Sequence, residues 1–205
     1  MPRARLNRAA IVSAAVDLVD AGGAAGFADL TLAALAAKVE IAVPSLYKHV
    51  SSLADLRREV AIVSVTDLTR AISAATTGRA GRDAVRAIAD AVREFARSYP
   101  GRYAATQVAA RQDDPLDADL GARSAETVAV IAAGLRGFDL PPDASIDVIR
   151  VVRSAVHGFV VLEIGGGFGL PHDLDRSFDL LVETVTGGIE RLGLERLGPA
   201  RSAAQ

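Results

Sequence analysis

The sequence predicts an all-α protein with about nine helices, and three observations lead to this prediction. Hydrophobic residues recur at intervals of three and four along most of the 205 residues, which is the spacing of one helix face. Clusters of Gly and Pro separate these segments and mark the breaks between helices. The most β-prone stretch, 148–162, is rich in Val and Ile, but its length without a turn signal favours a helix.

The first two helices are predicted from their capping residues. Asn7 can cap a helix that runs to about residue 20, where the glycines at 22–23 stop it. Thr31 can cap a second helix, because its hydroxyl can accept a bond from an orphan backbone N–H group. Apolar residues at helical spacing continue this second helix to a turn at 40–42.

A very short helix and then a long one follow the turn. Pro44 fits the first turn of the short helix, where its missing N–H group is not needed. Ser52 with Asp55 three residues later resembles a capping box, which opens a helix over about 53–75. Further helices are expected at about 82–98, 103–110, 116–135, 144–164 (capped by Asp143) and 174–192.

Composition narrows the classes of function. The formal net charge of −2 gives no sign of a nucleic-acid partner, and the lack of Cys excludes disulfides and thiolate metal sites. No apolar run reaches the roughly 18 residues of a membrane span, and no signal peptide is visible, so we expect a cytoplasmic protein without a membrane partner. We find no nucleophile with a base and no metal-ligand spacing, so we predict no catalytic residue, no metal, no cofactor and no enzyme.

Segment 43–50 has the design of a helix-turn-helix recognition element. Leu46 and Val50 can anchor a helix barely two turns long from behind. Polar side chains cluster on its other faces: Ser45, Tyr47, Lys48 and His49. Because such a helix lies in the major groove and presents side chains to bases and phosphates, we predict that the chain binds double-stranded DNA.

About the first 60 residues resemble the DNA-binding domain of the tetracycline-repressor-like (TetR) family. The basic tail of the family corresponds here to Arg3, Arg5 and Arg8, and its Gly-x-x-x-Phe element to the segment from Gly22 to Phe27. Its Leu-Thr element corresponds to Leu30-Thr31, and its Leu-Tyr-x-His-Phe element to residues 46–50. The chain departs from the pattern at three places. Glu40 stands where the family has the turn glycine, and Leu53 stands where it often has a phosphate-contacting lysine. Ala33 or Ala34 stands where the family usually has an Arg or Lys. We therefore expect a turn formed without the easy positive φ of glycine, and fewer phosphate contacts.

The resemblance and the helix geometry assign a set of DNA-binding residues: Arg3, Arg5, Thr31, Val43, Pro44, Ser45, Tyr47, Lys48 and His49. Tyr47 and His49 are expected on phosphates, the alternative being side chains packed on neighbouring helices. Val43, Ser45 and Lys48 are better placed to face bases. The alternative for the arginine-rich tail is a solvated terminus.

Segment 153–159, with the Gly-rich loop after it, resembles a C-terminal domain class of this family marked by a Trp-His-Gly triplet, with Val156 in place of the Trp. The resemblance covers about 80–192 and implies a ligand-sensing, dimerising domain. We expect it to bind a small, mostly apolar effector through Phe95, Tyr103, Gln107, Arg111, Arg153 and His157. The alternatives are aromatic residues and a histidine that belong to the core, and arginines in salt bridges, for instance with Asp147 or Glu126.

We expect four parts: a helix-turn-helix domain at 1–55, a linker helix at 56–79, a ligand-binding and dimerisation domain at 80–193, and a disordered tail at 194–205. The helices near 144–164 and 174–192 carry more apolar surface than one face can use, and Val160 is expected at the centre of a homodimer seam. We interpret the chain as a one-component repressor that reads a palindromic operator and is released by its effector. An all-α enzyme and a ligand-independent DNA-binding protein are the alternatives.

Overall fold

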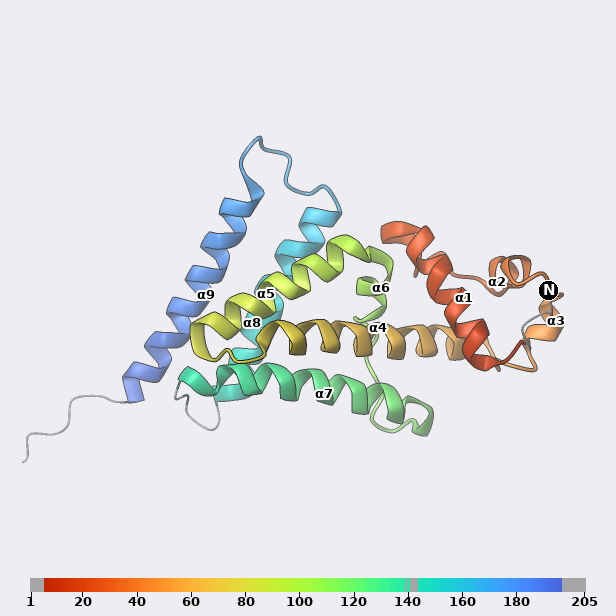
Figure 1. The fold of residues 1–205 in the computed structure, drawn as a ribbon, viewed down its shortest axis with the longest axis horizontal. Helices are drawn as coiled ribbons and strands as arrows, with labels where there is room; N and C mark the ends of the chain where they lie inside the picture. The colour runs from red at the N-terminus through yellow and green to blue at the C-terminus, as the bar shows by residue number, and fades with distance from the viewer. Residues whose placement is uncertain (1–5, 139, 141–143, 197–205) are drawn as a thin grey trace, which may run out of the picture. The chain divides into compact units, whose positions relative to one another are not determined.

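The structure is a computed structural model that describes residues 6–138, 140 and 144–196, and all regular structure within these ranges is helical, as predicted (Figure 1). The α-helices are α1 (Arg8–Ala21), α2 (Leu32–Lys38), α3 (Val43–Leu46), α4 (Leu53–Thr76), α5 (Gly81–Ser98), α6 (Pro100–Ala105), α7 (Ala118–Leu135), α8 (Ala144–Ile164) and α9 (Leu174–Arg196). Short 3₁₀ turns lie at Gly23–Ala25, Pro115–Asp117 and Arg136–Phe138. None of the described helices has the length and apolar character that a bilayer crossing needs.

The chain forms two compact units that alternate along the sequence. The first unit contains Met1–Thr69 and Phe95–Thr127, and the second contains Arg70–Glu94 and Val128–Gln205. Helices α4, α5 and α7 therefore contribute residues to both units. The expected division at residues 55, 79 and 193 separates parts with different proposed functions and not compact units, and it stays a prediction.

The N-terminal part of the first unit, α1 to α3, is called the head here. Its core combines Ile11 and Val19 of α1, Leu35 of α2, and Leu46 and Val50 beside α3, all almost fully buried. The predicted caps are confirmed. The side chain of Asn7 accepts a hydrogen bond from the N–H of Ala10 at 2.9 Å, and the hydroxyl of Thr31 accepts one from the N–H of Ala34 at 3.2 Å.

Helix α6 packs against α1 and the 3₁₀ turn at Gly23–Ala25. The close approach depends on Gly101, where a Cβ atom would lie 2.7 Å from two backbone carbonyl oxygens of the head. The expected bounds of 103–110 for this helix were wrong. Pro100 occupies the first turn of the helix, where its missing N–H group would have no partner within the helix. The regular helix ends at Ala105.

Arg102 of α6 joins three helices of the first unit. Its guanidinium donates to Asp20 of α1 at 2.9 Å and to Asp67 of α4 at 3.1 Å. The same group lies 3.7 Å from the ring centroid of Tyr99, a distance suited to a cation–π interaction. Because the Arg102 side chain is largely buried, both ion pairs are better protected from solvent than ordinary surface pairs.

In the second unit, α8 and α9 run in opposite directions and pack together (Figure 1). The segment 148–162 is helical, which resolves the strand alternative. Phe178 of α9 is completely buried and contacts the ring of Phe159 of α8 at 5.1 Å between centroids. Arg93 of α5 stacks over Phe178 and pairs with Glu163 at 2.5 Å, so α5, α8 and α9 share one aromatic and ionic cluster. The expected cap Asp143 lies outside the described residues.

Candidate nucleic-acid interface

The helix-turn-helix is held by buried apolar residues and by backbone bonds across its turn. Leu35 of α2 and Leu46 of α3 are both 0% exposed, so the two helices share one core. The N–H of Ile41 donates to the carbonyl of Ala36 at 3.0 Å and closes the end of α2. Pro44 lies in the first turn of α3, as predicted. The geometry therefore fixes α3 against α2 with its polar side directed outward.

The turn reaches a left-handed backbone conformation at a residue that is not glycine. Glu40 has φ 56°, and it is the non-glycine residue with positive φ in the described chain. The turn therefore keeps the conformation that suits glycine, and Glu40 adopts it without the ease that glycine would give. A side chain in this region crowds the adjacent carbonyl oxygen and costs about 1–2 kcal/mol.

The predicted recognition side chains differ in exposure. Tyr47 is 55% exposed, and Pro44 and Lys48 are also exposed. Val43, Ser45 and His49 are half-buried. Within the described part of the chain, the side chains of Tyr47 and Lys48 make no hydrogen bond or ion pair, so their polar ends are available to another molecule.

Thr31 and the N-terminal tail complete the predicted set. The hydroxyl oxygen of Thr31 caps α2, and its proton remains able to donate to a phosphate. Arg3 and Arg5 lie outside the described residues. Residues 1–60 contain seven Lys and Arg against six Asp and Glu, so a local basic surface depends strongly on these two arginines and on Lys48.

Comparison with known proteins identifies the fold and the family. A family model described as "Tetracyclin repressor-like, C-terminal domain" matches residues 85–185. The HTH-type transcriptional regulator Rv0681 of Mycobacterium tuberculosis is 36% identical over 189 residues, covering 92% of this chain and 84% of that protein. The chain belongs to the TetR family of transcriptional regulators. It is a DNA-binding regulator and not an enzyme.

Other members of the family agree with this assignment. YobS, an HTH-type transcriptional regulator of Bacillus subtilis, is 30% identical over 190 residues, covering 92% of this chain and 95% of that protein. A TetR regulator from Streptomyces coelicolor has a TM-score of 0.68 at 20% identity, covering 92% of this chain and 100% of that one. TetR from Acinetobacter baumannii in complex with minocycline has a TM-score of 0.65 at 19% identity, covering 92% and 98%. These two structures are similar to this chain in fold.

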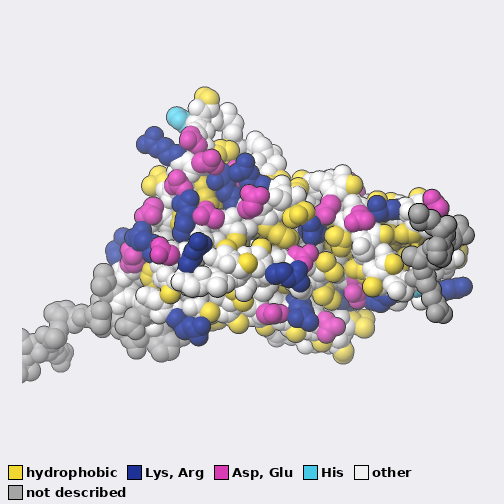
Figure 2. All heavy atoms as spheres, in the orientation of Figure 1, with side chains coloured by type: hydrophobic (Ala, Val, Ile, Leu, Met, Phe, Trp, Pro, Cys, Tyr) yellow, Lys and Arg dark blue, Asp and Glu magenta, His cyan; other side chains and the backbone are white. Residues whose placement is uncertain are grey.

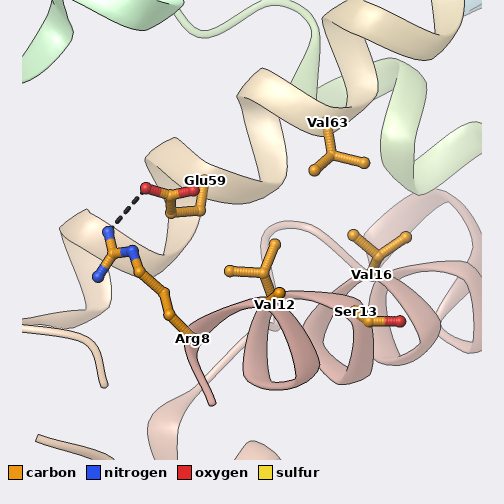
Figure 3. Close-up of a pocket in the computed structure, with 7 residues that line it drawn as sticks. Arg8, Val12, Ser13, Val16, Glu59 and Val63 are labelled. Carbon is orange, nitrogen blue, oxygen red and sulfur yellow. Dashed lines mark hydrogen bonds and ion pairs between the residues drawn. The ribbon is translucent and has the colours of Figure 1, made fainter. Parts of the chain in front are cut away.

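Arg8 is a residue of this TetR-family head whose position the sequence did not predict. The resemblance groups it with the basic tail, yet its side chain turns toward α4 and pairs with Glu59 (Figure 3). It also pairs with Asp55 at 2.8 Å. Arg8 is the first residue of α1, where a cation opposes the helix dipole. That unfavourable position was the available signal that a carboxylate partner lies nearby.

Arg57 of α4 is a second such residue. Its guanidinium donates to the carbonyl of Ala28 at 2.8 Å and lies 5.9 Å from the ring centroid of Phe27. It thereby fixes the segment that leads from the end of α1 into α2. No local pattern in the sequence connects position 57 with positions 27 and 28, so this contact could not be predicted from spacing.

The predicted effector residues are divided between the two units. Phe95 and Tyr103 are buried in the first unit, where Gln107 is exposed. Arg153 and His157 lie one turn apart on α8 in the second unit. Burial and then the nearby charge of Arg153 lower the pKa of His157 below its usual value, which favours a neutral imidazole.

Arg111 forms salt bridges, but not with Asp147 or Glu126, the acids that the sequence suggested. It pairs with Asp114 and with Asp117, the latter at 2.8 Å. The suggested acids are paired elsewhere, Glu126 with Arg123 and Asp147 with Arg150. Asp117 is buried and also accepts from Arg58 of α4 at 2.5 Å, and these arginines hold the pKa of its carboxyl well below the usual range. The Arg111 side chain is nevertheless 60% exposed, so part of it remains accessible.

A hollow in the first unit lies between α1 and α4 and has a volume of about 530 Å³ (Figure 3). Val12, Val16 and Val63 give it apolar walls, and the Arg8–Glu59 pair lies at one end. None of the predicted effector residues lines it. On the face drawn in Figure 2, acidic and basic side chains alternate without a large field of one sign.

Proposed function

We propose that this regulator is a repressor that binds a palindromic operator as a homodimer and is released by a small, mostly apolar effector. The observation that carries the DNA-reading part is the exposure of the two side chains that directly follow α3. Leu46 is fully buried, whereas the next two side chains, Tyr47 and Lys48, are exposed and have no partner among the described residues. Side chains of this kind can donate to phosphates and to the O6 and N7 atoms of guanine.

Exposed apolar residues on α8 and α9 support the homodimer. On α8, Val151 and Leu162 are 54% and 50% exposed, and on α9, Leu180 is 68% exposed. Gly158 lies between the two α8 residues, and a Cβ atom there would meet nothing within 4 Å among the described residues. A small residue flanked by exposed apolar ones allows a second helix to approach closely, and a twofold axis would bury the same stripe on both protomers.

The proposed seam lies on a different side of α8 from Val160, the residue that was expected from the sequence at the centre of the seam. Val160 is 0% exposed and Val156 is 4% exposed, because both pack within the protomer's own core. An Asp at Val160 would therefore damage the protomer before it tested the dimer. The exposed stripe through Val151, Gly158 and Leu162 is the surface that we propose for the partner.

A twofold dimer would present two α3 helices to successive major grooves, which leads to a palindromic operator. For the effector, we propose a binding site in the second unit that includes Arg153 and His157 of α8. Support comes from TetR of Acinetobacter baumannii, which has this fold and is found in complex with minocycline. An effector that favours a head spacing unsuited to DNA would shift the dimer population off the operator.

The DNA-reading part is tested with a duplex selected from random DNA by the wild-type protein. Tyr47→Ala and Lys48→Ala should each weaken binding by about 1–3 kcal/mol, or roughly five- to 150-fold. Leu116→Ala, an exposed leucine outside the head, is the control and should bind as the wild type does. If both head variants keep wild-type affinity while folded and dimeric, α3 is not the reading element.

The dimer is tested by sedimentation of Val151→Asp and Leu180→Asp. Each would bury an unpaired carboxylate in the seam twice per dimer, so the variants should sediment as monomers and lose the selected duplex. Val128→Asp is the matched control, because Val128 is an exposed valine of α7. A wild-type chain that stays monomeric at micromolar concentration would contradict the proposed dimer.

The effector is tested by a thermal-shift screen of small apolar molecules. A true effector should raise the melting temperature and release the selected duplex, and His157→Leu should change this response more than it changes DNA affinity. If every stabilising compound leaves the duplex bound, the release mechanism is wrong and the chain is a ligand-independent regulator.

A further inference from the structure

Arg8 is placed to hold the end of the recognition helix and not to contact DNA. Its Nη1 atom donates to the carbonyl oxygen of His49 at 2.7 Å, just after α3. The same guanidinium makes a two-pronged contact with Asp55 of α4, with Nη2 to Oδ1 at 2.8 Å and Nη1 to Oδ2 at 3.2 Å. Nη2 also donates to Glu59 at 2.7 Å. One planar group therefore connects α1, the end of α3 and the first turns of α4.

Asp55 extends this connection to the link between α3 and α4. Its carboxylate accepts hydrogen bonds from the backbone N–H and the hydroxyl of Ser51, at 2.8 and 3.1 Å. Its own N–H donates to the hydroxyl of Ser52 at 3.0 Å. The hydrogen bonds from Arg8, and then the two from Ser51, lower the pKa of Asp55 to about 2, so the carboxylate is charged at any physiological pH.

The recognition helix needs such support because it is short. Regular α-helix covers only Val43–Leu46, and Tyr47 and Lys48 lie beyond it in a turn. Few backbone bonds hold this turn, among them the one from the N–H of His49 to the carbonyl of Leu46 at 2.8 Å. A bond from Arg8 to the carbonyl of His49 therefore fixes the direction in which the two preceding side chains point.

The charge of Arg8 is already matched inside the protein. Two carboxylates contact the guanidinium, and only 45% of the side chain is exposed. A phosphate would have to compete with both acids for the same N–H groups. The fork geometry of arginine suits this role, because a lysine ammonium cannot reach a carbonyl and a carboxylate in one plane.

We propose that Arg8 is a positioning residue for DNA recognition, which ties the end of α3 to α4 and makes no phosphate contact of its own. This inference rests on the proposed role of α3 in reading DNA. It separates Arg8 from Arg3 and Arg5, which the resemblance groups with it in one basic tail.

The test compares Arg8→Lys and Arg8→Gln with Arg5→Lys and Arg5→Gln, using the duplex selected by the wild-type protein. If Arg8 positions α3, both Arg8 variants should lose affinity to a similar extent, about tenfold, because Lys keeps the charge and not the fork. The dependence of log K on log salt should keep its wild-type slope. At Arg5, Lys should bind as the wild type does, while Gln should reduce the slope by about 0.9.

Two further measurements keep the result interpretable. Hydrogen exchange at the amides of His49 and Val50 should become faster in both Arg8 variants, while exchange in α8 stays unchanged, which excludes general unfolding. The proposal is overturned if Arg8→Lys binds like the wild type, or if Arg8→Gln lowers the salt slope as Arg5→Gln does. The Tyr47→Ala and Lys48→Ala variants test the proposed DNA-reading role separately, since unchanged affinity in both would contradict that role and not the positioning role of Arg8.

Discussion

Replacing Glu40 with glycine should stabilise the head, although glycine usually weakens a folded chain. The left-handed conformation at φ 56° costs a residue with a Cβ atom about 1–2 kcal/mol. Glycine removes this strain, but it also gives the unfolded chain more freedom, which costs about 0.4–1 kcal/mol. The difference is a net gain of about 0–1.6 kcal/mol, with a central value of about 0.8 kcal/mol. Glu40 is exposed and makes no ion pair within the described residues, so little else is lost.

Native-state hydrogen exchange measures this change locally. The N–H groups of Val39 and Ile41 are bonded to carbonyls of α2, and both bonds open when the turn opens. Exchange at these amides should slow by about two- to fivefold in Glu40→Gly. Ala37→Gly is the matched control, because this exposed position lies inside α2, where glycine should cost about 1 kcal/mol. If both glycine variants exchange faster than the wild type, the turn does not store the strain inferred here.

Three further predictions concern packing and ion pairs. Gly101→Ala should destabilise the first unit by about 1–3 kcal/mol, because the added Cβ meets backbone oxygens that cannot yield. In Gly121→Ala the Cβ would have an ordinary 3.7 Å contact, so thermal unfolding should be unchanged or improved. Phe178→Ala should cost about 3–5 kcal/mol in urea unfolding, and a smaller loss would mean that the aromatic cluster collapses into the space. Because the pKa of Asp55 is lowered from 3.8 to about 2, its contribution to stability is complete above about pH 4 and is lost toward pH 2. Arg8→Gln should reduce this part of the acid dependence, because only the bonds from Ser51 remain, and an unchanged acid profile would contradict the coupling.

Local signals predicted most of the helices, because a cap and its helix lie close together in the chain. Asn7, Thr31 and Ser52 are confirmed as caps by bonds that span three residues. The bounds of α6 were missed, because clusters of Gly and Pro were interpreted only as breaks, although a proline such as Pro100 also starts helices. The helical spacing of apolar residues could not decide whether this proline ends one helix or starts the next.

The candidate site was predicted less completely, for a physical reason. Exposure of Tyr47 and burial of Leu46 follow from the spacing on one short helix, and the structure has both. The role of Arg8 depends on acids 47 and 51 residues away, and no periodicity brings such positions together. The conformation of Glu40 could be suspected only from the family's glycine, because a residue type alone does not fix its backbone angles.

The ion pairs of Arg102 have a consequence for how the first unit tolerates mutation. Two acids from different helices, Asp20 and Asp67, use the same guanidinium. A change at either acid still leaves Arg102 one carboxylate and its stacking on Tyr99. A change at Arg102 removes an ion-pair partner from both acids in a single step. Natural variation among related sequences should therefore be wider at positions 20 and 67 than at position 102. A sequence that lacks the arginine at position 102 should also lack the acids at positions 20 and 67 more often than other sequences do.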